Sequence, residues 1–328
     1  MLTETPTVGL NALNASRVPP PPTNGEPADE TIYLIGRPPM RGYIRFVRKQ
    51  GVHPANEHTL AEEWMAANRR IRELEKEEAG FADHPVMTPL TQFGARYEAL
   101  LGEFLKDPLV QSNFNTVPTD LALVELDRMV VHQKHIDLTF VEDLKKKLGP
   151  NPSDEMIFRT CLPFDHPHPP VKWSRMNRNT FVFVSSSNDL RFLDAMQLQP
   201  SHILGIAHPG SIVGAVGLAV GFGTNFLNAI YAEGRLILHN GSHRAYALRD
   251  LGVTHVPCLV QHVSSRDELE AVIGDEVAEQ ADRFLKDPRP SVLKDYFEPA
   301  LRKVVPVHRR VRQVTVKFEI EEGYIPAL

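Results

Sequence analysis

The segment 234–261 constrains the fold more than any other part of this chain, because it specifies four consecutive elements. The apolar run Leu236-Ile237-Leu238 is too short for a helix and lies between glycine and Asn240-Gly241, which predicts a buried strand. Apolar residues at helical spacing follow, and Gly252 ends them. A second extended run starts at Val256. The segment therefore predicts a strand, a tight turn, a helix and a second strand.

The turn between this strand and helix has the chemistry of an anion-binding site. Gly241 can take a positive φ, and Ser242 is predicted to cap the helix. The start of a helix presents unpaired amides and the positive end of its dipole, which suit phosphate, sulfate or carboxylate. Arg244 would add a forked pair of donors, and His243 a titratable group. The alternative is a plain turn with a capped helix and a solvated arginine, and local chemistry leaves it open.

The order of these residues resembles the signature of the ParB/sulfiredoxin superfamily. In its members a strand leads into a Gly-x-[His/Arg]-Arg turn, an alanine-containing helix, a Leu-Gly stop and a Val-Pro strand. The matching residues in this sequence are Gly241, Ser242, His243, Arg244, Ala247, Leu251-Gly252 and Val256-Pro257.

A second segment supports the resemblance. Residues Gln133 to Asp137 are similar to the early ParB segment, in which a Gln-x-Arg turn leads through an acidic N-cap into a helix, and residues 123–131 are predicted to be the preceding strand. A long insertion at about 149–233 separates the two segments. The resemblance implies an α+β fold with a mixed-sheet ParB/sulfiredoxin-like core at 119–262, a helical N-terminal cap and a C-terminal strand extension.

The resemblance also implies a ligand, a nucleotide or another phosphorylated small molecule, with ATP or CTP and magnesium as the expected cofactors. The expected ligand-binding residues are Asn240, Gly241, Ser242, His243, Arg244 and Gln133. If the protein is a phosphotransferase or nucleotide hydrolase, His243 and His135 are the expected proton carriers. Catalysis itself stays open, and a non-enzymatic ligand-gated regulatory or interaction protein is the alternative.

Two departures from the family pattern limit the chemistry. Ser242 stands where sulfiredoxins carry their cysteine, which argues against sulfinate repair because a hydroxyl without an adjacent base is a far poorer nucleophile than a thiolate. The early segment also lacks the glutamate that acts as base in the related serine kinases. Glu125, Asp127 and Asp137 are alternatives to His135 for that role.

Charge argues against DNA as a partner. The formal net charge is -5, and residues 264–284 predict an acidic helix at the position where ParB clamps carry a helix-turn-helix. An acidic helix would repel a phosphate backbone. The most basic segment, Arg302 to Arg312, precedes an alternating run and is interpreted as a charged strand edge that resists pairing with other chains.

The remaining regions are divided by composition. Residues 1–30 are rich in proline and predict a flexible tail without the features of a signal peptide. Residues 31–118 predict amphipathic helices, one of them opened by a capping box at Thr59 and Glu62, which form either a cap on the core or a homodimer surface. Residues 263–328 hold the acidic helix and the strand extension. With two distant cysteines, a reducing cytoplasm is the expected location.

The insertion contains three further candidates. Cys161, Asp165, His166 and His168 are potential metal ligands, but the prolines around them favour a surface loop, and no metal site is predicted. Residues 212–230, the least polar of the chain, predict a buried helix in preference to a membrane span. Residues 181–184 predict a strand, followed by a helix that contains Leu193 and Met196.

Overall fold

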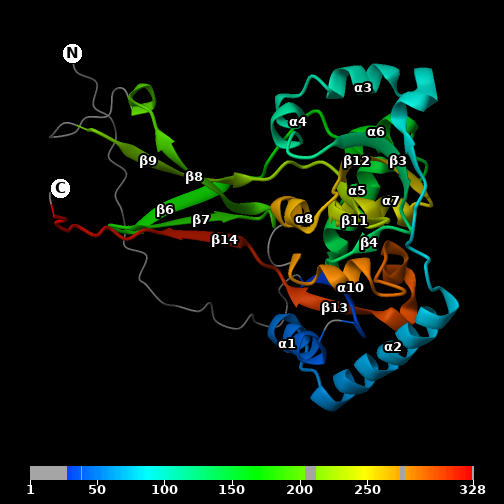
Figure 1. Ribbon diagram of the computed structural model, residues 1–328. Coiled ribbons are helices and arrows are strands. Elements are labelled where there is room, and N and C mark those ends of the chain that lie inside the picture. Colours follow the sequence, from blue (N-terminus) through cyan, green and yellow to red (C-terminus); the bar gives the residue numbers. More distant parts are fainter. Residues whose placement is uncertain (1–27, 38, 204–211, 274–277, 327–328) are drawn as a thin grey trace.

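The computed structural model describes residues 28–37, 39–203, 212–273 and 278–326. Figure 1 shows a body of helices and sheets from which a long β-arm projects, so the predicted mixed α+β class is confirmed. The predicted tail lies outside the described residues except for its last three, which belong to the first strand, β1 (Ala28–Leu34).

The body contains a six-stranded mixed sheet with the order β2-β3-β12-β10-β11-β4. Its strands are β2 (Met87–Pro89), β3 (Thr119–Glu125), β4 (Val130–Val131), β10 (Asn228–Ala232), β11 (Arg235–Asn240) and β12 (His255–His262). β10 and β12 run parallel, as do β11 and β4, whereas β12 and β3 are antiparallel. The inner strands β11 and β12 are apolar and buried almost throughout because elements cover both faces. The strand, turn, helix and strand predicted at 234–261 are confirmed as β11, α7 (Ser242–Asp250) and β12.

The main hydrophobic core lies between this sheet and a group of helices. They are α3 (Glu98–Phe104), α4 (Pro108–Asn113), α5 (Leu138–Leu148), α6 (Asp154–Cys161) and α7. Phe104 contacts both Phe158 and Phe226 edge to face, which joins α3 to α6 and to the segment before β10. The predicted acidic N-cap of α5 is confirmed, since the Asp137 carboxylate accepts the backbone N–H of Phe140 at 3.1 Å.

A smaller sheet and two helices form the lower part of the body. The sheet has the order β13-β1-β5, with β13 at Arg302–His308 and β5 at His135–Asp137. Helices α1 (Met40–Gln50) and α2 (Glu57–Glu77) pack against it through a second apolar cluster. The predicted capping box at Thr59 and Glu62 is wrong, because α2 begins one turn earlier and Asn56 caps it through a 2.8 Å bond from the backbone N–H of His58.

The arm consists of two small sheets that project side by side from the body (Figure 1). One has the order β14-β7-β6, from β6 (Val171–Asn177), β7 (Thr180–Ser185) and β14 (Arg312–Lys317). The other is the hairpin of β8 (Leu190–Leu198) and β9 (Ala215–Phe222). The insertion and the C-terminal extension therefore meet in the arm, where β14 pairs with β7.

Two predicted helices of the insertion are wrong. The stretch 212–230 contains β9 and the first three residues of the core strand β10, and Leu193 and Met196 lie in β8. Glycine and valine are poor helix formers, and β8 supplies β9 with the backbone partners that a helix would otherwise provide internally. The predicted insertion thus contains an inner strand of the core sheet.

Two other predicted elements are divided. The strand predicted at 123–131 is two strands, β3 and β4. β3 pairs with β12, and the backbone N–H of Leu126 bonds to the carbonyl of Thr254 at its end. The chain then turns, and β4 pairs with β11. The acidic helix predicted at 264–284 is α8 (Arg266–Ile273) and α10 (Ala281–Leu285), and residues 274–277 lie outside the described part. Among the helices that the structure describes, none has the length and apolar character needed to cross a membrane.

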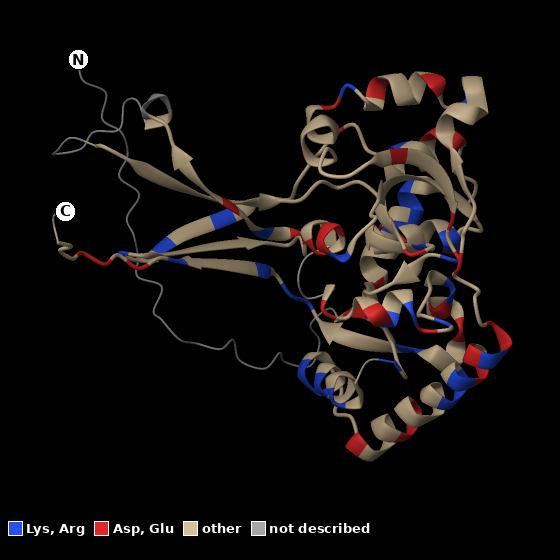
Figure 2. Ribbon diagram, viewed as in Figure 1, with Lys and Arg blue, Asp and Glu red and all other residues tan. Residues whose placement is uncertain are grey.

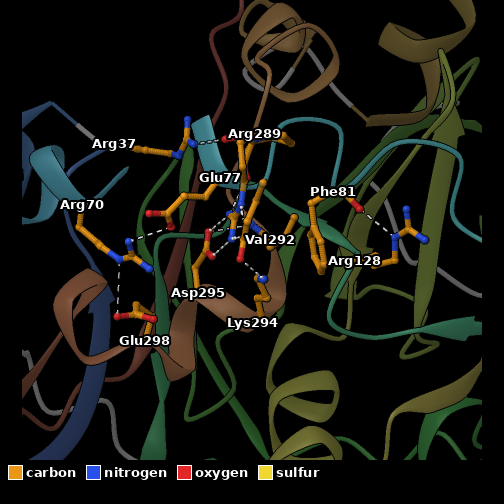
Figure 3. A network of polar contacts seen from close by, with 12 residues as sticks. Arg37, Arg70, Glu77, Phe81, Arg128, Arg289, Val292, Lys294, Asp295 and Glu298 are labelled. Carbon is orange, nitrogen blue, oxygen red and sulfur yellow. Dashed lines mark hydrogen bonds and ion pairs between the residues drawn. The ribbon is translucent and has the colours of Figure 1, made fainter. Parts of the chain in front are cut away.

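A buried ionic network joins α2 to the segment before β13 (Figure 3). Arg289, 1% exposed, donates to the Asp295 carboxylate at 2.7 and 2.6 Å and to the Glu78 carboxylate at 3.1 and 3.0 Å. Lys294 donates to the other oxygen of Glu78 at 2.7 Å. Each charge is paired, as burial requires.

Candidate functional site

A pocket of about 350 Å³ lies beside the loop that joins β4 to β5. Two residues predicted from the sequence, Gln133 and His135, line it, together with His132 and Lys134 of the same loop. Leu34 and Arg37 contribute from the end of β1, and Arg283 and Phe284 from α10. We call it the Gln133 pocket. It lies at the carboxyl end of the parallel strand β4, where ligands of open α/β sheets commonly bind.

The loop of the Gln133 pocket is fixed by its backbone. The buried Tyr296 hydroxyl donates to the carbonyl of Gln133 at 2.6 Å, and the backbone N–H of Leu34 donates to the carbonyl of Lys134 at 2.8 Å. The backbone N–H of Val131 bonds to the carbonyl of Ser291 at 2.9 Å. These bonds leave the side chains of Gln133 and Lys134 on a rigid support, which lowers the entropic cost of binding.

The charged lining of the Gln133 pocket is mainly cationic. The lining contains three cations, Arg37, Lys134 and Arg283, and one carboxylate, Asp287. Oδ2 of Asp287 lies 3.4 Å from Nη1 of Arg37. Nη2 of Arg283 donates to the carbonyl of Arg37 at 2.9 Å. Lys134 is exposed and has no carboxylate within ion-pair distance among the described residues. The lining therefore favours an anion, and Lys134 is the cation most available to it.

His135 is a neutral group of this pocket near pH 7. Burial lowers its pKa, and the nearby positive charge of Arg310 lowers it further. Its ring stacks on Phe46 at a centroid distance of 5.9 Å. A neutral imidazole can donate or accept a hydrogen bond, so His135 suits a polar group of a ligand.

The glycine turn before α7 differs from its predicted arrangement. Gly241, with φ at +95°, occupies the N-cap position, and Ser242 is the buried first residue of the helix without a capping bond, so its predicted capping role is wrong. A Cβ atom at position 241 would lie 3.1 Å from the Leu227 side chain and 3.2 Å from the Arg244 guanidinium. The site needs glycine both for its left-handed backbone and for this close approach.

Arg244 is directed into the protein. Its Nη1 donates to the carbonyls of Thr160 and Cys161 at 3.2 and 3.3 Å and also to the carbonyl of Asn225. Thr160 and Cys161 end α6, where helix carbonyls lack partners within the helix and a cation is favoured. Burial lowers the pKa of Arg244 to about 10, which leaves it charged at neutral pH. Its position is that of a structural cap, and it lines neither of the two pockets described in this section.

His243 follows the turn and faces α5. Its ring lies edge to face with Phe140 at 5.5 Å. Burial, with the nearby His135 and Arg244, lowers the pKa of His243 to about 4. The two predicted proton carriers therefore lie near each other, but a pKa of about 4 makes His243 a weak base at pH 7.

A second pocket, of about 280 Å³, is lined in part by the end of β11. Asn240, a predicted ligand-binding residue, lines it with His239 and Arg191, and its Nδ2 donates to the carbonyl of Thr224 at 2.8 Å. The rings of His239 and His132, one from each pocket, lie 6.4 Å apart. The structure thus divides the predicted residues. Gln133 and His135 share one pocket and Asn240 lines the other, whereas Gly241, Ser242, His243 and Arg244 line neither.

Sequence reasoning missed several residues of these pockets. His132 and His239 each follow the last apolar residue of a strand, in Val130-Val131-His132 and Ile237-Leu238-His239, and the two strands pair in parallel. That repeated pattern was an available signal, because polar residues at adjacent parallel strand ends meet. Arg37 and Arg283 come from separate elements, and no sequence pattern links them to the loop.

The potential metal ligands of the insertion do not form a centre. No group of three or more histidine, cysteine or acidic residues able to hold a metal ion occurs within the part of the chain that the structure describes. Cys161 is buried, which raises the pKa of its thiol to about 12, and His166 lies 2.7 Å from the carboxylate of Asp107. His166 therefore joins the insertion to the N-cap of α4.

No protein-family model, no curated protein and no solved structure matches this chain. The ParB/sulfiredoxin-like assignment consequently stays a prediction from the two sequence segments. The mixed sheet and the geometry of the two pockets are what the structure adds to it.

Proposed function

We propose that the protein binds a nucleotide or another phosphorylated small molecule in the Gln133 pocket, on a ParB/sulfiredoxin-like core. The observation that carries this proposal is the lining around the fixed loop at 131–135, in which Lys134 of the loop, Arg37 and Arg283 give three cations beside one carboxylate. The loop is one of the two segments that resemble the superfamily. The sequence analysis expected the ligand at the glycine turn, and this proposal places it at the neighbouring loop.

The pocket has complementary parts for such a ligand. Lys134 and Arg283 provide charge-assisted donors for phosphate oxygens. Leu34 and Phe284 provide apolar surface for a base or another ring. The volume of about 350 Å³ lies at the lower end of the range typical of small-molecule sites.

Binding without turnover fits the site better than catalysis. An efficient general base has a pKa near the working pH, and the pKa of His243 is about 4 while that of His135 is also lowered by burial. The ligand-gated regulatory function is therefore preferred to a phosphotransferase or hydrolase. If turnover does occur, magnesium bound with the nucleotide would supply the charge neutralisation that these residues do not.

Thermal unfolding of the full chain with ATP, CTP, GTP, ADP or inorganic phosphate, each with and without Mg²⁺, tests the proposal. A ligand at about 100 times its Kd stabilises the folded state by about 2.7 kcal/mol. We expect such a shift in the wild type and its loss in Lys134→Ala. Lys146→Ala, an exposed lysine paired with Asp143 on α5, is the matched control and should keep the shift.

Two results would contradict the proposal. One is the absence of any shift at millimolar concentrations of every ligand, and the other is a shift that Lys134→Ala leaves intact. Release of labelled phosphate from a stabilising nucleotide would separately decide between turnover and binding alone.

A further inference from the structure

The second pocket, here called the Asn240 pocket, has a mostly polar lining. Its volume is about 280 Å³, and three of its eleven lining residues are apolar, namely Phe114, Ala271 and Val272. Most small-molecule pockets are lined mainly by apolar side chains, so this lining selects a ligand whose own surface is mostly polar. The inner strands β10, β11 and β12 each contribute one carboxamide, and these are Asn228, Asn240 and Gln261.

Two of these carboxamides are buried and leave hydrogen-bonding groups open. Asn228 and Gln261 are each 5% exposed, and Nδ2 of Asn228 donates to Oε1 of Gln261 at 3.2 Å. Oδ1 of Asn228 and Nε2 of Gln261 make no hydrogen bond to any residue that the structure describes. Turning both amides over exchanges the roles of their atoms, so one acceptor and one donor remain open in either orientation. Burying such groups without a partner costs free energy, which an occupant of the pocket would recover.

The two buried amides differ from the rest of the strands that carry them. Every other buried residue of β10 and β12 is apolar, because both strands lie inside the core sheet. Apolar side chains of similar size would fill positions 228 and 261 without leaving a polar group unpaired. Polar residues at such positions are expected where function requires them. The pair therefore has the character of a binding site rather than of core packing.

The charges around the Asn240 pocket favour an uncharged ligand. Arg191 is the one ionised side chain in the described lining, and it pairs with Asp189. His239 is neutral near pH 7, because burial lowers its pKa to about 4. Helix α8 contributes two residues to the lining and is acidic (Figure 2), through Asp267, Glu268 and Glu270. The arginine disfavours a cation and the acidic helix disfavours an anion.

We propose that the Asn240 pocket binds an uncharged, polyhydroxylated small molecule of monosaccharide size. Each hydroxyl group both donates and accepts, so hydroxyls satisfy the open donor of Gln261 and the open acceptor of Asn228 together. Thr116 and the neutral His239 add further groups that hydroxyls can bond. The ring of Phe114 would contact the C–H groups of the ligand. This ligand is distinct from the phosphorylated one proposed for the Gln133 pocket, whose lining contains three cations.

A nucleobase and water fit the Asn240 pocket less well. The two faces of a base are flat and stack on aromatic or apolar side chains, whereas apolar residues are three of the eleven in this lining. Water fills many polar cavities and could satisfy the two buried amides. Water alone would not explain why two inner strands keep polar residues where apolar ones would pack.

Saturation-transfer NMR of the full chain with D-ribose, D-glucose, D-galactose and myo-inositol tests the proposal, and calorimetric titration gives the Kd of any that responds. We expect at least one to bind with a Kd of about 1 mM or lower, within reach of a ligand of about 10–12 non-hydrogen atoms. The double variant Asn228→Leu with Gln261→Met should weaken that binding by about tenfold or more. It should stay as stable as the wild type, because both partners of the hydrogen bond are replaced together by side chains of similar size.

A single variant and two controls complete the test. Thr116→Val removes one exposed hydroxyl of the lining and should weaken binding by about threefold or more. Thr59→Val, on α2 and outside the lining, is the matched control and should bind like the wild type. Lys134→Ala should also keep sugar binding, and the double variant should keep the nucleotide shift, which separates this test from that of the Gln133 pocket.

Three outcomes would overturn the proposal. The first is the absence of saturation transfer and of heat for all four compounds up to about 50 mM, which would leave water as the occupant. The second is binding of adenosine or cytidine that the double variant abolishes while none of the four compounds binds, which would make the pocket a site for a planar base. The third is binding of a sugar that both the double variant and Thr116→Val leave unchanged. Circular dichroism checks the folding of each variant, and if the double variant does not fold, Thr116→Val against Thr59→Val decides.

Discussion

Arg244 and Arg289 in the body are buried with their guanidinium groups among protein acceptors, whereas Arg175 and Arg312 in the arm are exposed and donate to backbone carbonyls of arm residues. Arg289 is paired with two carboxylates, and Arg244 with three carbonyls. The difference separates two uses of the same side chain. In the body arginine pairs with buried acceptors, and in the arm it lies at the surface.

This comparison changes the meaning of the motif that dominates the sequence. The Gly-Ser-His-Arg turn resembles a ligand-binding signature, but its arginine caps α6 and thereby connects the insertion to the core helix α7. Lys134, which lines the Gln133 pocket, has no carboxylate within ion-pair distance among the described residues. A basic residue in a motif must therefore be judged by the acceptors it already has.

Arg289→Met should give the largest loss of stability. The substitution leaves Asp295, which is 4% exposed, without its bidentate partner, and breaking a buried pair from one side costs about 3–5 kcal/mol. Urea unfolding measures this change. Arg70→Met removes an arginine from exposed pairs with Glu73 and Glu77 and should cost less than about 1 kcal/mol. Equal losses in both variants would contradict the difference between buried and exposed arginines.

Arg244→Ala should destabilise the protein by about 3 kcal/mol, because it removes the donor from three carbonyl groups of which those of Thr160 and Cys161 end α6. Urea unfolding without ligand measures the loss, and Arg244→Lys should recover part of it by retaining the charge. A fully stable Arg244→Ala that loses the nucleotide shift would instead assign Arg244 to the ligand.

Local pattern explains which parts of the fold could be predicted. The elements at 234–261 and the N-cap of α5 depend on apolar spacing, glycine and a capping carboxylate, all within a few residues. The arm depends on pairing between distant segments, β8 with β9 and β7 with β14. A glycine-rich apolar run does not specify helix or strand until such a partner is known.

In the candidate site, too, residues within one segment could be predicted, and residues brought together from distant segments could not. Gln133 and His135 could be placed in a pocket because they lie in one recognisable segment. Arg37 and Arg283 could not, since their positions are set by packing of β1 and α10. The role of Arg244 was also beyond the sequence, because burial and the end of α6 decide it.

Acidification should destabilise the body through its neutral histidines. Burial lowers the pKa of His239 and of His243 to about 4, below the value of about 6.5 in an unfolded chain. The unfolded state therefore takes up protons first, so stability is complete above pH 6.5 and falls as the pH approaches 4. Each histidine should remove up to about 1.4 kcal/mol per pH unit in the middle of this range, and about 1 kcal/mol between pH 6.5 and 5.5, where its unfolded form is only partly protonated.

Urea unfolding between pH 6.5 and 5.5, above the range of most carboxylates, measures this effect. The double variant His239→Gln with His243→Gln should reduce the slope of stability against pH by about 2 kcal/mol per unit in this window, twice the single value. The exposed His53→Gln is the control and should keep the wild-type slope. An unchanged slope in the double variant would place the proton uptake elsewhere.

Lys172→Gln with Lys317→Gln should have the smallest effect, a change of less than about 0.5 kcal/mol in the free energy of unfolding, because both side chains are exposed and make no ion pair with a described residue. Urea unfolding under the conditions used for Arg289→Met measures it. A loss comparable to that of Arg244→Ala would mean that the arm cations also join segments of the protein, and the contrast between body and arm would fail.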